Sequence, residues 1–386
     1  MSEKWITAWG MACCNGDRAS ANVGRCTTRT SVSSGINGKR LRLRLSNHYG
    51  KKNLVLGKVM VETGQYKGQA CLDGKETIHL AAGEEMCTDA LEVPVSAGEP
   101  ISVSIYYPQR TRPISGNSTF IQTHSVPGDY TARDFAPQAL RFAATRYFRP
   151  SPSLPEPLTT LRALDVCTEE ENAFSVIALG DSITQTGYWV DPLREQLQRT
   201  YAGSATLLNM GISGNRLLLD TGARFLPGMF GQAGLERMDW DVFALAGSKA
   251  VVLALGINDI IQPGMGPMSP QIKERCSAVG LIAGYAKVIA ACHAREIKVI
   301  GCTITPFGGM VTSNATTETI RQIANDWILH SGTFDATFDF AAIMADPADP
   351  TRLLPDYDSG DHLHPNAQGG KALADASDLP TLVAYL

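Results

Sequence analysis

The stretch FSVIALGDSIT, residues 174–184, decides the fold of the second half of the chain. Its apolar run (residues 174–179) has the length and continuity of a strand that is buried on both faces. Strands of this kind occur in parallel sheets that helices cover. The Gly-Asp-Ser tripeptide that follows (residues 180–182) would therefore lie at the sheet edge where α/β proteins bind ligands.

Predicted strands and helices alternate through the remainder of this half. The periodicity predicts helices over residues 189–201, 271–294 and 317–330, and further strands over residues 205–210, 250–255, 297–304 and 336–340. This alternation indicates an α/β domain with a parallel sheet covered on both faces.

Residues from about 1 to 170 follow a period of two instead. In residues 40–45 arginines and leucines alternate, which places the leucines on one face of a half-buried strand. Similar short stretches follow at residues 54–62, 77–80 and 101–107, separated by turn sequences. Short strands at this spacing, without a convincing amphipathic helix, predict an antiparallel β-sandwich that resembles a jelly roll.

A chain of 386 residues is too long for one ordinary core, because domains usually hold about 100–200 residues. The proline- and serine-rich stretch at residues 150–157 is typical of a surface connection. We therefore predict two domains, an accessory β-sandwich over residues 1–170 and an α/β domain over residues 171–386.

Charge and composition exclude several classes of function. A net charge of -4 without a basic cluster argues against nucleic acid as a partner. No apolar run approaches the ~20 residues of a membrane span. The cysteines are odd in number and lack metal-ligand spacing, so we expect thiols and neither metal nor cofactor. The N-terminus has no apolar leader, which indicates a cytoplasmic protein or one whose leader was removed. Oligomeric state is left open.

Four short polar motifs fall where predicted strands end or close to the C-terminus. They are Gly180-Asp181-Ser182, Asn209 to Asn215 with Gly211 and Gly214, Gly256-Ile257-Asn258-Asp259, and Asp361-His362-Leu363-His364. Because parallel strands end at one edge of a sheet, the fold would bring these motifs together.

Acyl transfer explains why these residue types should meet. A serine hydroxyl is a weak nucleophile at neutral pH and needs a base within hydrogen-bond reach. His364 would take the proton of Ser182 and later deliver it to the leaving alkoxide. Asp361, three residues earlier, would accept the other ring N–H and stabilise the imidazolium.

The attacked carbonyl becomes an oxyanion and needs hydrogen-bond donors that are already in place. The candidates are the backbone N–H groups of Ser182 and Gly214 and the side-chain amide of Asn258. Glycine at position 214 lets the backbone approach the substrate without a Cβ in the way.

Taken together, the four motifs resemble the four blocks of the SGNH/GDSL hydrolase superfamily. The resemblance covers about residues 172–386 and makes Ser182, Gly214, Asn258 and His364 the residues for which the superfamily is named. It implies a three-layer, flavodoxin-like hydrolase domain with Asp361 as the third triad member. The leucine of the family motif is Ile183 here, a conservative departure.

The whole chain also resembles a two-domain branch of this superfamily described as acetylxylan-esterase-like. The resemblance rests on Trp5-x-x-x-Trp9, on Arg42 to Asn47, and on the run from Asp356 to His364. It implies a β-sandwich before the hydrolase domain and small acyl groups on a carbohydrate or other small-molecule ester.

Each of these residues also has a structural interpretation. Ser182 could cap the turn after the strand, and His362 competes with His364 for the role of base. The carboxyls of Asp181 and Asp259 are expected to brace loops, not to catalyse. Arg216 is expected to anchor its loop rather than to hold a substrate.

Three functions remain open. The leading hypothesis is a serine carboxylester hydrolase that removes acetyl or other short acyl groups through an acyl-serine intermediate. The second is a lysophospholipase or lipase, for which the apolar stretch at residues 217–230 would serve as a lid. The third is a carbohydrate-binding or scaffold protein with an inert hydrolase domain, against which the complete set of motifs argues.

Overall fold

The computed structural model describes residues 3–17, 20, 22–117, 122–133, 159–221, 228–266 and 269–385. The chain divides into two compact units. Unit one comprises Met1–Phe174 with Ala202–Thr206, and unit two comprises Ser175–Tyr201 with Leu207–Leu386. The predicted connection at residues 150–157 lies outside the described residues.

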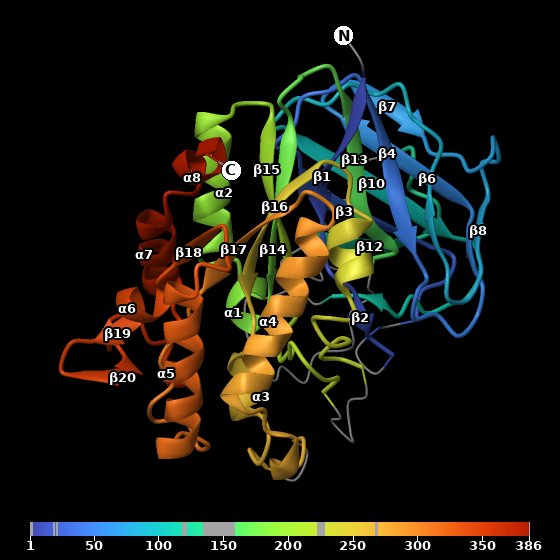
Figure 1. The fold of residues 1–386 in the computed structure, drawn as a ribbon. Coiled ribbons are helices and arrows are strands. Elements are labelled where there is room, and N and C mark those ends of the chain that lie inside the picture. The colour runs from blue at the N-terminus through green and yellow to red at the C-terminus, as the bar shows by residue number, and fades with distance from the viewer. Residues whose placement is uncertain are drawn as a thin grey trace. The chain divides into compact units, whose positions relative to one another are not determined.

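Unit one consists of antiparallel strands, as the sequence predicts (Figure 1). One sheet has the order β1 (Lys4–Gly10), β13 (Leu161–Thr168), β4 (Arg40–Ser46), β9 (Glu85–Cys87). A second sheet has the order β12 (Gln122–Pro127), β3 (Cys26–Ser33), β10 (Pro100–Tyr107), β6 (Lys58–Thr63), β7 (Tyr66–Gln69). Two small ladders pair β5 (Leu54–Leu56) with β8 (Ile78–Leu80), and β2 (Cys14–Asn15) with β11 (Ser115–Gly116). The β-sandwich prediction is confirmed, although Gly57 divides the predicted strand at residues 54–62 in two.

The alternation in β4 separates an apolar face from a charged one. Its three leucines are completely buried in the core of unit one. On the other face, Arg42 and Arg44 both bind the carboxylate of Asp165 on β13, at 3.0 and 2.9 Å. The hydroxyl of Thr7 donates to the same carboxylate at 2.7 Å. Asp165 is 0% exposed, so its charge is tolerable only because these donors surround it.

Unit two is built on a five-stranded sheet. Its order is β15 (Ala205–Gly211), β14 (Phe174–Gly180), β16 (Ser248–Ala254), β17 (Lys298–Cys302), β18 (Ala336–Phe338). The pairs from β14 through β18 are parallel. Counted along the chain, the order is 2-1-3-4-5, which is the flavodoxin-like order. The α/β prediction for this half is confirmed.

Helices cover both faces of this sheet. The longer ones are α2 (Val190–Thr200), α4 (Ala278–His293), α5 (Ala315–His330), α7 (Ala367–Ser377) and α8 (Leu379–Tyr385). The chain runs one way from β14 to β15 and the other way from β16 to β18. Right-handed crossovers therefore place α2 on one face and α4 and α5 on the other. Among the described residues, no helix is long and apolar enough to cross a membrane.

Short elements lie between the strands and at the C-terminal end of the sheet. They are α1 (Ser182–Gln185), the π-helix η1 (Asp239–Phe243), α3 (Ile257–Ile261), the 3-10 helix η2 (Ile272–Glu274), α6 (Phe340–Met344), and the hairpin of β19 (Ala345–Asp346) with β20 (Asp349–Leu353).

The long helix predicted over residues 271–294 begins later than expected. Residues 272–274 form only η2, and α4 begins at Ala278 after the N-cap Ser277, whose hydroxyl accepts the N–H of Gly280. The segment between them is held to α3 instead. Arg275 donates to the carbonyls of Ile260 and Pro263, at 3.0 and 2.8 Å. These tertiary bonds outweigh the apolar periodicity that suggested one continuous helix.

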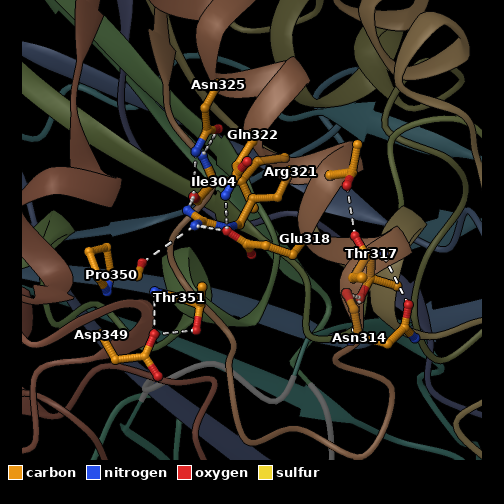
Figure 2. A network of polar contacts seen from close by, with 12 residues as sticks. Ile304, Asn314, Thr317, Glu318, Arg321, Gln322, Asn325, Asp349, Pro350 and Thr351 are labelled. Carbon is orange, nitrogen blue, oxygen red and sulfur yellow. Dashed lines mark hydrogen bonds and ion pairs between the residues drawn. The ribbon is translucent and has the colours of Figure 1, made fainter.

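A polar network fixes the loop that leaves β17 (Figure 2). The side-chain amide of Asn325 binds both backbone groups of Ile304, accepting its N–H at 2.7 Å and donating to its carbonyl at 2.9 Å. The guanidinium of Arg321 donates through two nitrogens to the carboxylate of Glu318. It also donates to the carbonyl of Pro350 at 3.5 Å. The network therefore ties this loop to α5 and to the β19–β20 hairpin.

The buried ion pairs of Asp165 with Arg42 and Arg44 can be compared with an exposed ion pair of unit one for their effect on stability. Asp165→Asn should lower the free energy of unfolding by about 2–4 kcal/mol, because it leaves two partly buried guanidinium groups without a counter-charge. The measurement is urea denaturation followed by circular dichroism. Glu169→Gln, which removes the exposed partner of Lys39, is the matched control and should leave the midpoint nearly unchanged. Equal midpoints for the two variants would contradict this account.

Candidate active site

Ser182 lies two residues after the end of β14, next to the point where the strand order reverses. The side chain of Asp181 caps α1 by accepting the N–H of Ile183 at 3.0 Å. Ser182 is half-buried and begins this one-turn helix, so its hydroxyl stands at the carboxyl edge of the sheet. Gly180 keeps the turn tight, because a Cβ there would lie 1.9 Å from the hydroxyl of Thr184.

The structure brings His364 and Asp361 to this serine. Nε2 of His364 lies 2.8 Å from Oγ of Ser182, and Nδ1 lies 2.6 Å from Oδ2 of Asp361. A carboxylate can only accept, so Nδ1 carries the proton that Asp361 binds. Nε2 of the neutral ring is then an acceptor, and the hydroxyl of Ser182 donates to it. The three side chains thus form one continuous hydrogen-bonded chain.

The carboxylate of Asp361 is held in its charged form. Partial burial acts to raise its pKa, but the hydrogen bonds from the ring and the backbone N–H of His364, and from the N–H of Leu363, outweigh it. The pKa of Asp361 therefore lies well below its ordinary value. The charge that orients the imidazole persists wherever the protein is folded near neutral pH.

His362, the competing histidine, points to a different partner. Its Nδ1 lies 2.8 Å from Oδ2 of Asp358, and half of its side-chain surface is exposed. Its backbone has a φ of 62°, a left-handed conformation that turns the chain between Asp361 and His364. Among the described residues, His364 alone of the two reaches Ser182.

The Gly214 and Asn258 segments meet beside Ser182. The N–H of Ile212 donates to the carbonyl of Gly180 at 3.1 Å, which joins the end of β15 to the end of β14. Nδ2 of Asn258 donates to the carbonyl of Asn215 at 3.1 Å. Gly214 has a φ of 70°, and a Cβ there would lie 2.4 Å from the ring of Phe230. Only glycine fits this position without strain.

Hydrogen-bond donors remain available at this point. Among the described residues, the backbone N–H groups of Ser182 and Gly214 donate to no protein acceptor. Nδ2 of Asn258 carries two hydrogens, and one of them binds the carbonyl of Asn215. A hydroxyl relayed to a histidine, beside donors of this kind, can attack a carbonyl and stabilise the resulting oxyanion.

A buried arginine that the sequence analysis missed holds these segments together. Arg237 is 2% exposed and donates to the carbonyl of Gly180 at 2.8 Å and to that of Met210 at 2.9 Å. It also donates to the side chain of Asn215 at 2.9 Å and pairs with Asp241 at 2.7 Å. The ends of β14 and β15 and the Gly214 loop are therefore fixed by one guanidinium.

Asp181 and Asp259, the other two carboxylic acids at the strand ends, hold loops in place, as expected. Burial raises the pKa of Asp181 to about 7, against the lowering effect of the bond from Ile183. Burial likewise raises the pKa of Asp259 to about 6, although its oxygens accept the N–H groups of Leu217 and Leu218 at 2.7 and 3.0 Å. Arg216 is fully buried and donates to Glu274, so it anchors its own segment.

A second residue that the analysis missed is Gln262, at the C-cap of α3. It follows Asn258 by four positions, a spacing that puts both side chains on one face of a helix. That spacing was the available signal, but α3 was not predicted as a helix. Among the described residues, no group of three or more His, Cys, Asp and Glu side chains is placed to hold a metal ion.

With this geometry in place, the chain can be compared with known proteins. A model of the GDSL-like lipase/acylhydrolase family matches residues 178–372, just over half of the chain. The chain belongs to this family. As a member of a family of acylhydrolases, it is a carboxylic ester hydrolase. No curated protein sequence matches it.

Several solved structures are similar to just over half of the chain. The acetylxylan esterase Axe2 from Geobacillus stearothermophilus is 19% identical, with a TM-score of 0.40 over 56% of this chain and 97% of its own. The acetyl xylan esterase AlAXEase is 22% identical, with a TM-score of 0.38 over 53% and 97%. A GDSL-like lipase from Bacteroides thetaiotaomicron is 19% identical, with a TM-score of 0.40 over 57% and 91%. Sequence identities and TM-scores this low do not identify the substrate of this chain.

The burial of Asp181 has a measurable consequence for stability. Its pKa is higher in the folded than in the unfolded protein, so the native protein loses stability as pH rises from about 4 to about 7. Asp181→Asn keeps an oxygen to cap α1 and removes this loss. The stability gained by the variant should therefore be larger at pH 8 than at pH 5, by about 2–3 kcal/mol.

Denaturant unfolding of both proteins at the two pH values measures the difference. Asp375→Asn, at an exposed position on α7, is the control and should show no comparable pH dependence. A gain for Asp181→Asn that is the same at pH 5 and pH 8 would contradict the raised pKa.

Proposed function

We propose that this hydrolase removes acetyl or other short acyl groups from carbohydrate esters through an acyl-serine intermediate. The observation that carries the reaction type is the hydrogen-bonded chain from Ser182 through His364 to Asp361. The proposal that the alcohol part of the ester is a carbohydrate rests on the sequence resemblance to the acetylxylan-esterase-like branch.

In the first half-reaction, Oγ of Ser182 attacks the ester carbonyl while Nε2 of His364 takes the hydroxyl proton. The carbonyl oxygen gains negative charge and is bound by the N–H groups of Ser182 and Gly214 and by Nδ2 of Asn258. The C–O bond to the alcohol then breaks, and His364 returns its proton to the leaving oxygen. The products of this step are the free alcohol and acyl-Ser182.

In the second half-reaction, water replaces the alcohol. His364 takes a proton from water as it attacks the acyl carbon, and the same donors bind the new oxyanion. The bond to Oγ breaks and the proton returns to Ser182, which releases the carboxylic acid. Asp361 stays ionised throughout and stabilises the imidazolium that forms in each half.

One feature favours a short acyl group over a long one. The first part of the segment that could form a lipase lid is fixed in place, because Asp259 accepts the backbone N–H groups of Leu217 and Leu218 at 2.7 and 3.0 Å. A lid that opens over a long acyl chain would have to break these two hydrogen bonds.

The lipase alternative retains one observation in its favour. Leu219, which follows the anchored residues, is 48% exposed. The centre of the proposed lid, including Phe225, Leu226 and Pro227, lies outside the described residues. The length of the acyl chain that is hydrolysed fastest separates the two functions.

Ser182→Ala should lower the turnover of nitrophenyl acetate by about 10⁴-fold or more, because alanine lacks the hydroxyl that attacks the carbonyl. The fold should persist, which circular dichroism checks. Ser331→Ala, at the exposed C-cap of α5, is the control and should keep native turnover. Native turnover in Ser182→Ala would overturn the assignment of the nucleophile.

Hydrolysis of nitrophenyl esters from acetate to laurate tests the acyl length. We expect kcat/KM to fall by about tenfold or more beyond four carbons, because one methylene too many for a pocket costs about 1–3 kcal/mol of transition-state binding. Acetylated xylo-oligosaccharides should then be deacetylated, with acetate release as the measurement. A maximum at eight carbons or more would refute the short-acyl proposal and favour the lipase alternative.

A further inference from the structure

Gln262 is a buried side chain whose amide nitrogen binds both candidate oxyanion segments. Its Nε2 donates to the carbonyl of Gly214 at 2.6 Å and to Oδ1 of Asn258 at 3.1 Å. Its Oε1 accepts the hydroxyl of Thr221 at 3.3 Å. It is 8% exposed, so these bonds are made largely out of reach of water.

We propose that Gln262 is a positioning residue that sets the direction of the Asn258 amide and holds the Gly214 turn, so that both present N–H groups to the reacting carbonyl. This inference rests on the proposed function. Gln262 itself does not touch the reacting atoms.

The direction of both amides follows from their backbone partners. A carbonyl oxygen can only accept, so the atom of Gln262 that faces the carbonyl of Gly214 has to be its nitrogen. That nitrogen also faces Asn258, which must therefore turn its oxygen toward Gln262. The nitrogen of Asn258 is then left on the other side, where it meets the carbonyl of Asn215. The network is consistent in one direction only.

The same network leaves one donor of Asn258 for the substrate. Of the two hydrogens on Nδ2, one binds the carbonyl of Asn215 and the other has no partner among the described residues. If the amide were reversed, its oxygen would face the carbonyl of Asn215 and the developing oxyanion, and both contacts would be repulsive. Gln262 excludes that arrangement because it needs an acceptor at Oδ1.

Gln262 also restrains the turn that carries Gly214. The N–H of Asn215 donates to the carbonyl of Ile212 at 3.0 Å and closes the turn from one side. The carbonyl of Gly214 is held from the other side by Gln262 at 2.6 Å. The hydroxyl of Thr221 lies 3.2 Å from the same carbonyl and 3.3 Å from Oε1 of Gln262, and it shares its one proton between these two acceptors. A glycine at positive φ has wide conformational freedom, so these bonds limit where its N–H points.

A merely structural glutamine would stabilise the fold without acting through Asn258. A double-mutant cycle on kcat/KM for nitrophenyl acetate separates the two roles. We expect Asn258→Ala to lower kcat/KM by about 10²–10³-fold and Gln262→Met by about 10–100-fold, mainly in kcat. In the Asn258→Ala background, the further loss from Gln262→Met should be at least about threefold smaller than in the native background.

The pH profile provides a second readout. Gln262→Met should leave the pH midpoint of kcat/KM unchanged, because His364 and Asp361 are untouched. Gln196→Met, at a half-buried glutamine on α2 that binds Asp375 and not the candidate site, is the matched control and should retain native kinetics. Equal losses in both backgrounds, or native activity in Gln262→Met, would overturn the inference.

A milder variant covers the case in which Gln262→Met does not fold. Thr221→Val keeps the shape and removes the hydroxyl that binds Oε1 of Gln262, and we expect a loss of about 2–10-fold in kcat that shrinks in the Asn258→Ala background. No loss, or the same loss in both backgrounds, would overturn the inference. Ser182→Ala tests the proposed function separately. If Ser182→Ala is inactive and Gln262 is dispensable, only the positioning role fails.

Discussion

Arg237 donates four hydrogen bonds inside unit two, and three of them reach the segments that carry the candidate site. Parallel strands end in carbonyls that the sheet itself does not satisfy, and at a buried edge these must find donors elsewhere. The guanidinium donates to the carbonyl of Gly180, the last residue of β14, which also accepts the N–H of Ile212. It donates as well to the carbonyl of Met210, the next-to-last residue of β15. Asp241 makes this burial tolerable by balancing the charge. The nucleophile and the Gly214 turn are thereby fixed to one rigid group.

Charge is divided between the interior and the surface of the site. The carboxyls of Asp181 and Asp259 are buried, and burial raises the pKa of each toward neutrality. Asp361 is half exposed, and hydrogen bonds hold its pKa low. The carboxylate that must stay ionised during proton transfer is therefore the one that water can reach. The two buried carboxyls accept backbone N–H groups and so fix the loops of the site. Their burial lowers the stability of the folded protein near neutral pH.

Much of this arrangement could be predicted from the sequence, because local patterns encode it. Apolar runs that end in glycine and polar residues predicted β14 and β16 and the positions of Ser182 and Asn258. Arg237 could not be predicted in this way, because two of its acceptors are main-chain carbonyls, which every residue possesses. Gln262 was missed because α3 is too short to produce a helical period. The helix over residues 271–294 was predicted to start too early. The hydrogen bonds from Arg275 to the α3 region are tertiary and leave no local pattern in the sequence.

The segment from Asp361 to His364 is nearly self-sufficient. The carboxylate binds the imidazole and two backbone N–H groups within the same four residues. The serine, in contrast, lies 182 positions earlier in the chain, and its hydroxyl meets Nε2 of His364 at 2.8 Å. The proton relay and the nucleophile therefore come from two separate segments, each held by its own local hydrogen bonds. A rigid-body shift of the C-terminal segment would lengthen the bond between Ser182 and His364 without breaking the bonds inside either segment, so catalytic alignment depends on how firmly the two segments are packed together.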